Sequence, residues 1–506
     1  MRIVPVLFAL MLGSGLAAAP VSVRVEAPTY AGKHIRLFAY SDLFTLRTVL
    51  LAEAELDAQG NAMLSADVMG TRKAIFRVGP VGADLYLRAG TYHVRIPPPA
   101  SGEALPLGGT IRVDLEFIDL PALDVNALVS DLNERLDAFV AEQLATDNNA
   151  GMNEVAKVRA GKVKPTADSA RAPAQIFTGP QWAPARTDTF AQKLRKFYAD
   201  VHDTWFQSDV EYGLAGLYLG PRNDDRKLFE RYLKDKPVLY DVPEYVRFFN
   251  GFYEGYMMRF GYAKAPDSFA AFLRSANTDS LKTMLARNDF LRAPEVNELV
   301  LINGLYAEHG NKQLDPRGVL AVLQYVQAHS VFPENRTLAA NMVADLTAMQ
   351  PGQPLPSLRL RTVDGTAEDL SALPAGPVCI FITTPRCTYC EQELAALGQQ
   401  VKEYGEYVQF VGILAKGENT DMSAWLAEHP DAMGLTWYSP TRTDELLEEL
   451  RLVSVPAVYL VTDNILLASP GPLPSQGLTN VLFSIKAKAD EERRIKPDRG
   501  MPPPKR

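Results

Sequence analysis

Two cysteines separated by two residues carry the strongest chemical signal in this sequence. Cys387 and Cys390 end the run Thr383-Thr-Pro-Arg-Cys387-Thr-Tyr-Cys390, between a strand-like apolar segment and an amphipathic helical pattern. Residues three apart in a first helical turn lie about 5–6 Å apart, close to what a disulfide needs. Such a pair can open and close without a rearrangement of the backbone, which is what thiol–disulfide exchange requires.

The two thiols are expected to have different roles. At a helix N-terminus the unsatisfied N–H groups and the positive end of the dipole favour a thiolate, and Arg386 adds a positive charge beside it. Glu391 and Glu393 act in the opposite direction. The first cysteine of such a turn is normally the accessible one, so Cys387 is predicted to be the nucleophile and Cys390 the resolving thiol.

Metal binding and a static disulfide are two other roles open to these cysteines. A zinc site needs four ligands, and none of the six histidines stands near the pair in the sequence, so no metal and no other cofactor is expected. A static structural disulfide remains an alternative. Cys379, the third cysteine, precedes Cys387 by eight residues on a strand rising ~3.3 Å per residue. It is too far away to bridge and is predicted to be an inert core thiol.

A second motif is the apolar run Val453-Ser-Val-Pro456-Ala-Val-Tyr-Leu460. A proline removes a hydrogen-bond donor from a strand ladder, so Pro456 needs a strand start, an edge or a special turn. Only about 5–6% of X–Pro bonds are cis, so these residues alone leave the isomer of the Val455-Pro456 bond open.

Together these motifs resemble the thioredoxin fold, in which a C-x-x-C pair begins a helix and a proline precedes a later strand. The lead-in from Gly352 to Gly365, followed by Asp369-Leu-Ser, is similar to the TlpA/ResA-type thiol–disulfide reductases. The resemblance covers about residues 350–489. It implies that the Val455-Pro456 bond is cis and lies beside the cysteines, so that Val455 and Pro456 help to bind an extended substrate strand.

The sequence departs from that family's pattern at three places around the pair. Arg386 replaces the tryptophan common before the first cysteine, and Thr388-Tyr389 replaces Gly-Pro. Phe381 stands where thioredoxins place a buried aspartate that helps to move the proton of the resolving thiol. The direction of the redox reaction, whether reduction, oxidation or isomerisation, therefore stays open.

Hydrophobic patterning divides the remaining chain, and we predict a multidomain protein. Alternating apolar residues with turn signals predict an antiparallel β-sandwich over residues 20–120. Helical periodicity predicts an all-α domain over 121–350, with a mobile segment at about 148–186, and a thioredoxin-like α/β domain follows at 351–489. The charged, proline-rich tail at 490–506 is predicted to be disordered. The three-domain order also resembles large bacterial envelope proteins with an N-terminal β-domain and a helical middle.

The first 19 residues have the pattern of a secretory signal peptide. Met1-Arg2 is followed by about ten apolar residues and then by small residues, and ten apolar residues are too few to span a bilayer. Secretion across the inner membrane, to the periplasm, is therefore expected, with no stable membrane insertion after the signal is removed. The 52 basic and 60 acidic residues give a net charge of −8, which argues against a nucleic-acid partner.

Two functions from different classes follow from these observations. The first is a secreted thiol–disulfide oxidoreductase that acts on protein thiols or disulfides through Cys387 and Cys390, together with an unidentified redox partner. The second is a non-catalytic envelope binding or adaptor protein that uses a thioredoxin-like scaffold.

Overall fold

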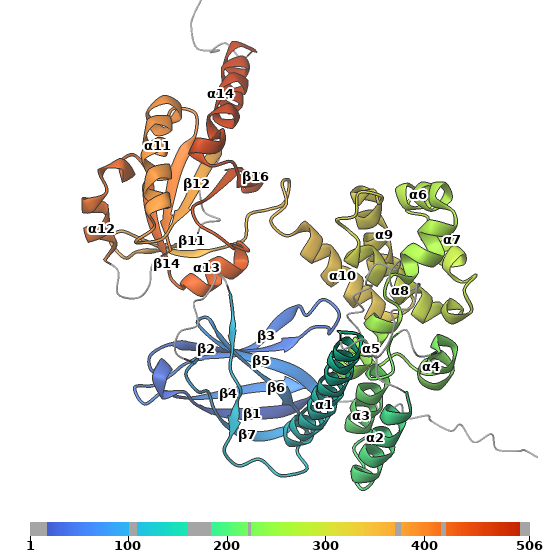
Figure 1. Cartoon of the computed structure of the whole chain (residues 1–506). Coiled ribbons are helices and arrows are strands. Elements are labelled where there is room, and N and C mark those ends of the chain that lie inside the picture. The colour runs from blue at the N-terminus through green and yellow to red at the C-terminus, as the bar shows by residue number, and fades with distance from the viewer. Residues whose placement is uncertain are drawn as a thin grey trace, which may run out of the picture. The chain divides into compact units, whose positions relative to one another are not determined.

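The computed structural model of the chain describes residues 18–100, 109–159, 184–220, 224–369, 376–415 and 421–495 (Figure 1). All but the last two residues of the predicted signal peptide lie outside this part. The described residues fall into two compact units. The first comprises residues 1–98 with 112–343, and the second comprises 99–111 with 344–506.

The first unit begins with two β-sheets. One has the strand order β4 (Asn61–Val68), β1 (Ala19–Glu26), β7 (Gly90–Arg95), β9 (Glu116–Phe117). The other has the order β3 (Thr48–Glu55), β2 (His34–Tyr40), β5 (Arg72–Val78), β6 (Val81–Leu87), β8 (Ile111–Arg112). The 3-10 turn η1 (Pro28–Tyr30) joins β1 to β2. One central pair, β1 with β7, is parallel, so the antiparallel pattern expected from the sequence does not extend to every pair.

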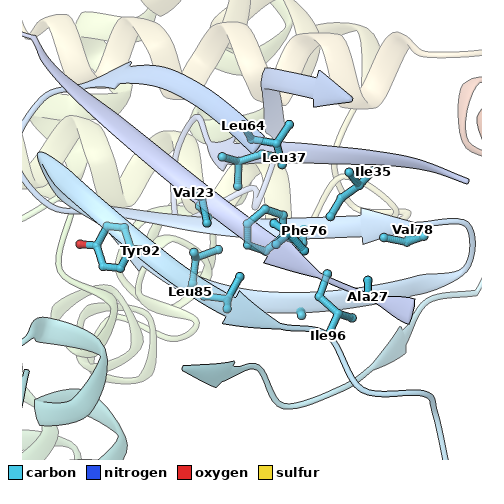
Figure 2. Packing of buried hydrophobic residues seen from close by; sticks show 14 of the residues in the cluster. Val23, Ala27, Ile35, Leu37, Leu64, Phe76, Val78, Leu85, Tyr92 and Ile96 are labelled. Carbon is cyan, nitrogen blue, oxygen red and sulfur yellow. The ribbon is translucent and has the colours of Figure 1, made fainter. Parts of the chain in front are cut away.

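The two sheets share one hydrophobic core. Successive side chains of a strand point to opposite faces, so every second residue turns inward. Figure 2 shows Val23 from one sheet beside Leu37, Phe76 and Leu85 from the other, and each of the four is at most 2% exposed. The alternation seen in the sequence therefore corresponds to a two-sheet sandwich with a dry interior.

Helices form the rest of the first unit. They are α1 (Val125–Arg159), α2 (Pro184–Phe197), α3 (Thr204–Gly216), α4 (Asp225–Tyr232), α5 (Pro243–Phe252), α6 (Pro266–Arg274), α7 (Thr278–Leu285), α8 (Pro294–Ala307), α9 (Pro316–His329) and α10 (Pro333–Thr347). The short turns η2 (Met257–Gly261), η3 (Tyr262–Lys264) and η4 (Asp289–Leu291) lie among them. Aspartate caps at Asp203, Asp224 and Asp315 accept the first free N–H groups of α3, α4 and α9.

Helix α1 extends further than the apolar pattern indicates. It continues to Arg159, into the segment at about 148–186 where apolar periodicity stops and which is predicted to be mobile. A helix is held by its backbone hydrogen bonds, and alanine, methionine, glutamate and lysine support it without an apolar stripe. Residues 160–183 lie outside the described part.

The aromatic cluster of α5 is core, as its helical spacing indicates. Tyr245, Phe248, Phe249 and Phe252 are each at most 5% exposed, and their rings contact one another and Tyr212. They pack α5 against α3, so they offer no open cage for a ligand.

The sandwich and the helices belong to one compact unit rather than forming separate domains. Asn126 of α1 accepts from the Tyr86 N–H of β6 at 2.7 Å, and its amide donates to the Tyr86 carbonyl at 2.9 Å. Arg88, beyond the end of β6, makes an ion pair with Asp203, the cap of α3. These polar contacts fix the first turns of α1 and α3 on the sheet.

The second unit is built on one mixed sheet. Its strand order is β11 (Ala367–Asp369), β10 (Arg359–Thr362), β14 (Thr436–Pro440), β13 (Gln409–Leu414), β12 (Pro377–Thr383), β15 (Ala457–Thr462), β16 (Ile465–Gly471). Its helices are α11 (Thr388–Tyr404), α12 (Met422–Glu428), α13 (Thr443–Glu449) and α14 (Leu478–Ile495), with the turns η6 (Pro430–Ala432) and η7 (Pro474–Gln476). Strands β12, β13 and β14 are parallel, and β15, β16 and β10 run antiparallel to their neighbours.

Both faces of this sheet are covered. Ile380 and Ile382 of β12 pack on one face with Leu446 of α13, and Phe381 packs on the other with Leu394 of α11. Figure 1 shows α11 and α14 on the opposite side of this sheet from α13. Helix α14 reaches Ile495, so the first six residues of the tail predicted to be disordered are helical. No helix in the described ranges is both long and apolar enough to cross a membrane.

We expect Asn126→Ala to destabilise the first unit by about 1–3 kcal/mol, because the substitution leaves the backbone groups of Tyr86 without these partners at a buried site. Asn303→Ala is the matched control, since Asn303 bonds Asn250 at the exposed surface and its loss should cost less than about 0.5 kcal/mol. Urea unfolding measures both. Equal losses in the two variants would contradict a specific role for Asn126.

Candidate functional site

The C-x-x-C pair lies where the central strand of the second sheet ends. Strand β12 pairs with β13 on one side and β15 on the other, and it ends at Thr383. The chain then turns through Arg386, whose backbone has a left-handed φ of 64°, and enters α11 at Thr388. A left-handed φ is sterically unfavourable for a residue other than glycine. Arg386 adopts it at the turn that directs the chain into the helix.

Cys387 and Cys390 form a disulfide across the first turn of α11, with their Cα atoms 5.1 Å apart. Cys387 is the N-cap residue, and its sulfur accepts a hydrogen bond from the Cys390 N–H at 3.1 Å. It is half-buried, whereas Cys390 is only 2% exposed. An attacking thiolate can therefore reach the sulfur of Cys387 more easily than that of Cys390.

The Val455-Pro456 bond is cis, as the resemblance to the thioredoxin fold implies. Pro456 is buried and stands directly before β15, which is the strand-start position that its missing N–H requires. Because Ile382 pairs with Ala457, the Val455-Pro456 segment lies at the end of the sheet where β12 gives way to the turn before Cys387. Val455 precedes the first paired residue of β15, so its backbone is outside the ladder.

Cys379 is buried in the core and does not take part in the disulfide. It lies in the middle of β12 opposite Phe410 and Leu460, with no exposed surface and no disulfide partner. Burial raises the pKa of its thiol to about 12, because the surrounding apolar side chains cannot solvate a thiolate. The prediction of an inert core thiol is confirmed in burial and in the absence of a bridge.

The first turns of α11 carry two carboxylates in different surroundings. Glu393 is 2% exposed, and it accepts hydrogen bonds from the Ser475 N–H at 3.0 Å and from the Ser475 hydroxyl. These bonds tie α11 to η7, so the sequence-based view of Glu393 only as a charge near the thiols is incomplete. The side chain of Glu391 is half-exposed, and it lies 3.7 Å from a ring nitrogen of His429.

His429 is the residue at this site that sequence reasoning missed. In the sequence, the histidines were excluded from the site because none lies near the cysteines along the chain. His429 stands between α12 and η6, far from the cysteines in sequence. Packing of η6 against α11 brings its ring to the first turn of that helix. No local pattern in the sequence could have indicated this proximity.

Nothing in the described ranges resembles a metal centre, since no group of three or more histidine, cysteine, aspartate or glutamate side chains converges there. The polar contact described for the pair itself is the one from the Cys390 N–H to the sulfur of Cys387. A disulfide at a helix start, with one sulfur partly exposed, has the arrangement that exchange between thiols and disulfides requires.

No protein-family model matches this sequence, and no curated protein matches it significantly. Among solved structures, a thioredoxin domain of a thiol-disulfide oxidoreductase from Bacteroides vulgatus is similar at 15% identity, covering 27% of this chain and 98% of its own, with a TM-score of 0.25. A thiol:disulfide interchange protein from a Bacteroides species is similar at 13% identity over 28% of this chain and 93% of its own, with a TM-score of 0.25. A thioredoxin-like protein from Bacteroides caccae covers 62% of this chain and 96% of its own, at 14% identity and a TM-score of 0.27.

TM-scores this low do not define a fold, so the assignment depends on the chain's own topology. A central strand leads into a helix that begins with a C-x-x-C pair, and a cis-proline stands before the adjacent antiparallel strand. The second unit is therefore a thioredoxin-like domain in a multidomain chain.

We expect the three thiols of the reduced protein to differ in alkylation. At mildly alkaline pH, iodoacetamide should modify Cys387 first and Cys390 more slowly, because Cys390 is buried, and it should leave Cys379 unmodified until the protein unfolds. Peptide mass spectrometry resolves the order. Modification of Cys379 at the rate of Cys387 would show that the interior of β12 opens to solvent.

Proposed function

We propose that this protein is a thiol–disulfide oxidoreductase of the TlpA/ResA type that acts on protein thiols or disulfides in an extracytoplasmic compartment. The observation that carries the proposal is the disulfide across the first turn of α11, with the sulfur of Cys387 partly accessible and that of Cys390 buried. A disulfide that served only to staple the fold would have no need of a helix N-terminus or of unequal exposure.

Exchange proceeds through a mixed disulfide. A substrate thiolate attacks the sulfur of Cys387, so that a substrate–Cys387 bond forms, the Cys387–Cys390 bond breaks and Cys390 leaves as a thiolate. A second substrate thiolate then attacks the substrate sulfur of this mixed disulfide and releases Cys387. The substrate dithiol has then been oxidised to a disulfide and the pair reduced to two thiols. The two protons lost by the substrate thiols are balanced by the two that the cysteine thiolates take up from solvent.

The start of α11 stabilises the thiolates that leave and attack during these exchange steps. The N–H of Cys390 already donates to the sulfur of Cys387, and the positive end of the α11 dipole favours negative charge at that sulfur. The same steps in reverse reduce a substrate disulfide. The direction depends on the partner that restores the pair, which must be a dithiol or disulfide redox protein or a small thiol.

Val455 is proposed to hold the substrate chain. Its backbone lies outside the β15 ladder at the end of the sheet that carries Cys387, so an extended peptide can pair with it as an added strand. Pro456 keeps this backbone in place at the start of β15. Tyr389 in the first turn of α11 and Val453, two residues before Val455, are 46% and 82% exposed and add apolar surface.

Secretion across the inner membrane, to the periplasm, is part of this proposal. It is supported by the charged, apolar and small-residue pattern of residues 1–19. An oxidising compartment also suits a protein whose working group cycles through a disulfide.

We expect the protein to catalyse reduction of insulin by dithiothreitol, and we expect Cys387→Ser to reduce turnover to the uncatalysed rate because the attacking thiolate is lost. Cys379→Ser is the matched control and should keep full turnover, since that thiol is buried and unbridged. If the wild type shows no turnover and its disulfide does not cycle in glutathione buffers, the adaptor interpretation replaces this one.

Cys390→Ser should trap partner proteins on Cys387 as mixed disulfides, whereas Cys387→Ser should trap none. Without the resolving thiol, the mixed disulfide has no internal route of release. Non-reducing gels of the secreted fraction, followed by reduction, measure the trapped species. Equal trapping by both variants would reverse or abolish the assigned roles.

A further inference from the structure

The loop between α13 and β15 begins with a helix end of a kind that favours glycine. Leu450 is the C-cap of α13, and Arg451 follows it with a left-handed φ of 49°. The N–H of Arg451 donates to the Glu448 carbonyl at 3.1 Å. The N–H of Leu452 donates to the Leu447 carbonyl at 2.9 Å. These two bonds form a Schellman motif, in which the left-handed position is most often glycine because a Cβ atom is unfavourable there.

The side chain of Arg451 binds the end of α10. Its Nη2 donates to Oδ1 of Asp345 at 2.7 Å, and its Nη1 donates to the Asp345 carbonyl oxygen at 3.1 Å. Both residues belong to the second unit, and 47% and 39% of their side chains are exposed. A glycine would suit the backbone of this turn better, but it cannot make these bonds. The arginine therefore ties the start of the loop to α10.

Burial and one further hydrogen bond anchor the rest of the loop. Leu450 and Leu452 are 2% and 4% exposed. They share a core cluster with Val455 and with Met349, which lies two residues after α10. The Tyr459 hydroxyl of β15 donates to the Leu450 carbonyl at 3.2 Å. The loop is therefore held at its beginning and at its end.

The exposed residues of the loop lie between these anchors. Val453 is 82% exposed, and Ser454 is exposed as well. Val455 follows, and its backbone lies outside the β15 ladder. A peptide that adds a strand here pairs with this backbone, and any mobility of the loop must be lost when it binds. Fixing the loop in advance therefore lowers the entropic cost of binding a peptide.

We propose that Arg451 is a positioning residue for polypeptide substrates, which fixes the loop before Pro456 by binding Asp345 at the end of α10. The inference rests on the proposed function in that Val455 pairs with the substrate chain. Arg451 takes no part in the chemical step, because the thiols exchange at Cys387. Loss of its side chain should therefore weaken the binding of a polypeptide and leave the reaction with a small disulfide unchanged.

Two substitutions of Arg451 separate the side chain from the backbone. Arg451→Gly and Arg451→Ala both remove the bonds to Asp345, but only glycine accepts the left-handed φ without a steric cost. We expect both variants to raise the KM for insulin, with dithiothreitol as reductant, by roughly twofold to fivefold, the range that partly exposed ion pairs give. The kcat should not change, since only binding is affected. Urea unfolding should give a lower midpoint for the alanine variant than for the glycine variant.

A small disulfide distinguishes positioning from a general loss of structure. The reduced protein attacks dithiodipyridine through Cys387, and this reagent has no peptide backbone that the loop can bind. Both Arg451 variants should react at the wild-type rate, measured by the absorbance of the released thiopyridone. A KM for insulin that is unchanged, or that follows the urea midpoint instead of the loss of the side chain, would overturn the proposal. Equal losses with both substrates would overturn it as well.

Arg226→Ala is the matched control for the loss of an arginine. It removes an exposed ion pair with Asp289 in the first unit, where the nitrogen and oxygen atoms are 3.4 Å apart. This variant should change neither the KM for insulin nor the rate with dithiodipyridine.

Hydrogen exchange tests the anchoring of the loop without any turnover. Asp345→Ala removes the shorter of the two bonds to Arg451 and leaves the sequence of the loop unchanged. The N–H of Leu452 should then exchange roughly twofold to fivefold faster, because the turn that it closes opens more often. Unchanged exchange would overturn the positioning role. Absent insulin turnover by the wild-type protein would overturn the proposed function instead, whatever the exchange of Leu452.

Discussion

Burial of both faces of β12 is the constraint on which the second unit depends. Its alternate side chains enter two separate cores, with Ile380 and Ile382 in one and Phe381 in the other, and helices must therefore cover both sides of the sheet. A strand buried in this way has to be central, with β13 and β15 as its neighbours. The turn before α11 and the segment before β15 are then brought to one end of the sheet, which is where Cys387 and Val455 stand.

The same strand shows how burial decides thiol chemistry. Cys379 and Cys387 are close in sequence, but Cys379 points into the dry core, where a thiolate cannot be solvated and the pKa of the thiol is about 12. Cys387 follows the strand, at a helix start where the Cys390 N–H donates to its sulfur. The two cysteines therefore differ in their surroundings, since the side chains are identical.

In the first unit, polar contacts determine how the sandwich and the helices combine. Asn126 satisfies both backbone groups of Tyr86, and Asp203 combines a helix cap with the ion pair to Arg88. Buried polar groups of this kind are costly when unpaired, so they favour one placement of α1 and α3 over others. The hydrophobic pattern alone permits two independent domains. These hydrogen bonds, together with the packing of Tyr86 against Trp205 and of Phe44 against Phe249, join them in one unit.

Local patterns in the sequence were sufficient for much of this protein. The strand at 378–382, the helix start at Cys387 and the strand after Pro456 follow from apolar runs, cysteine spacing and proline chemistry, because each depends on residues close together in the chain. Contacts between residues far apart in the chain depend on tertiary packing, and the sequence did not indicate them. The parallel pairing of β1 with β7, the junction of Asn126 with Tyr86 and the approach of His429 to Glu391 each join segments that no periodicity relates. The extension of α1 to Arg159 was missed for another reason, since backbone hydrogen bonds can continue a helix where its apolar stripe has ended.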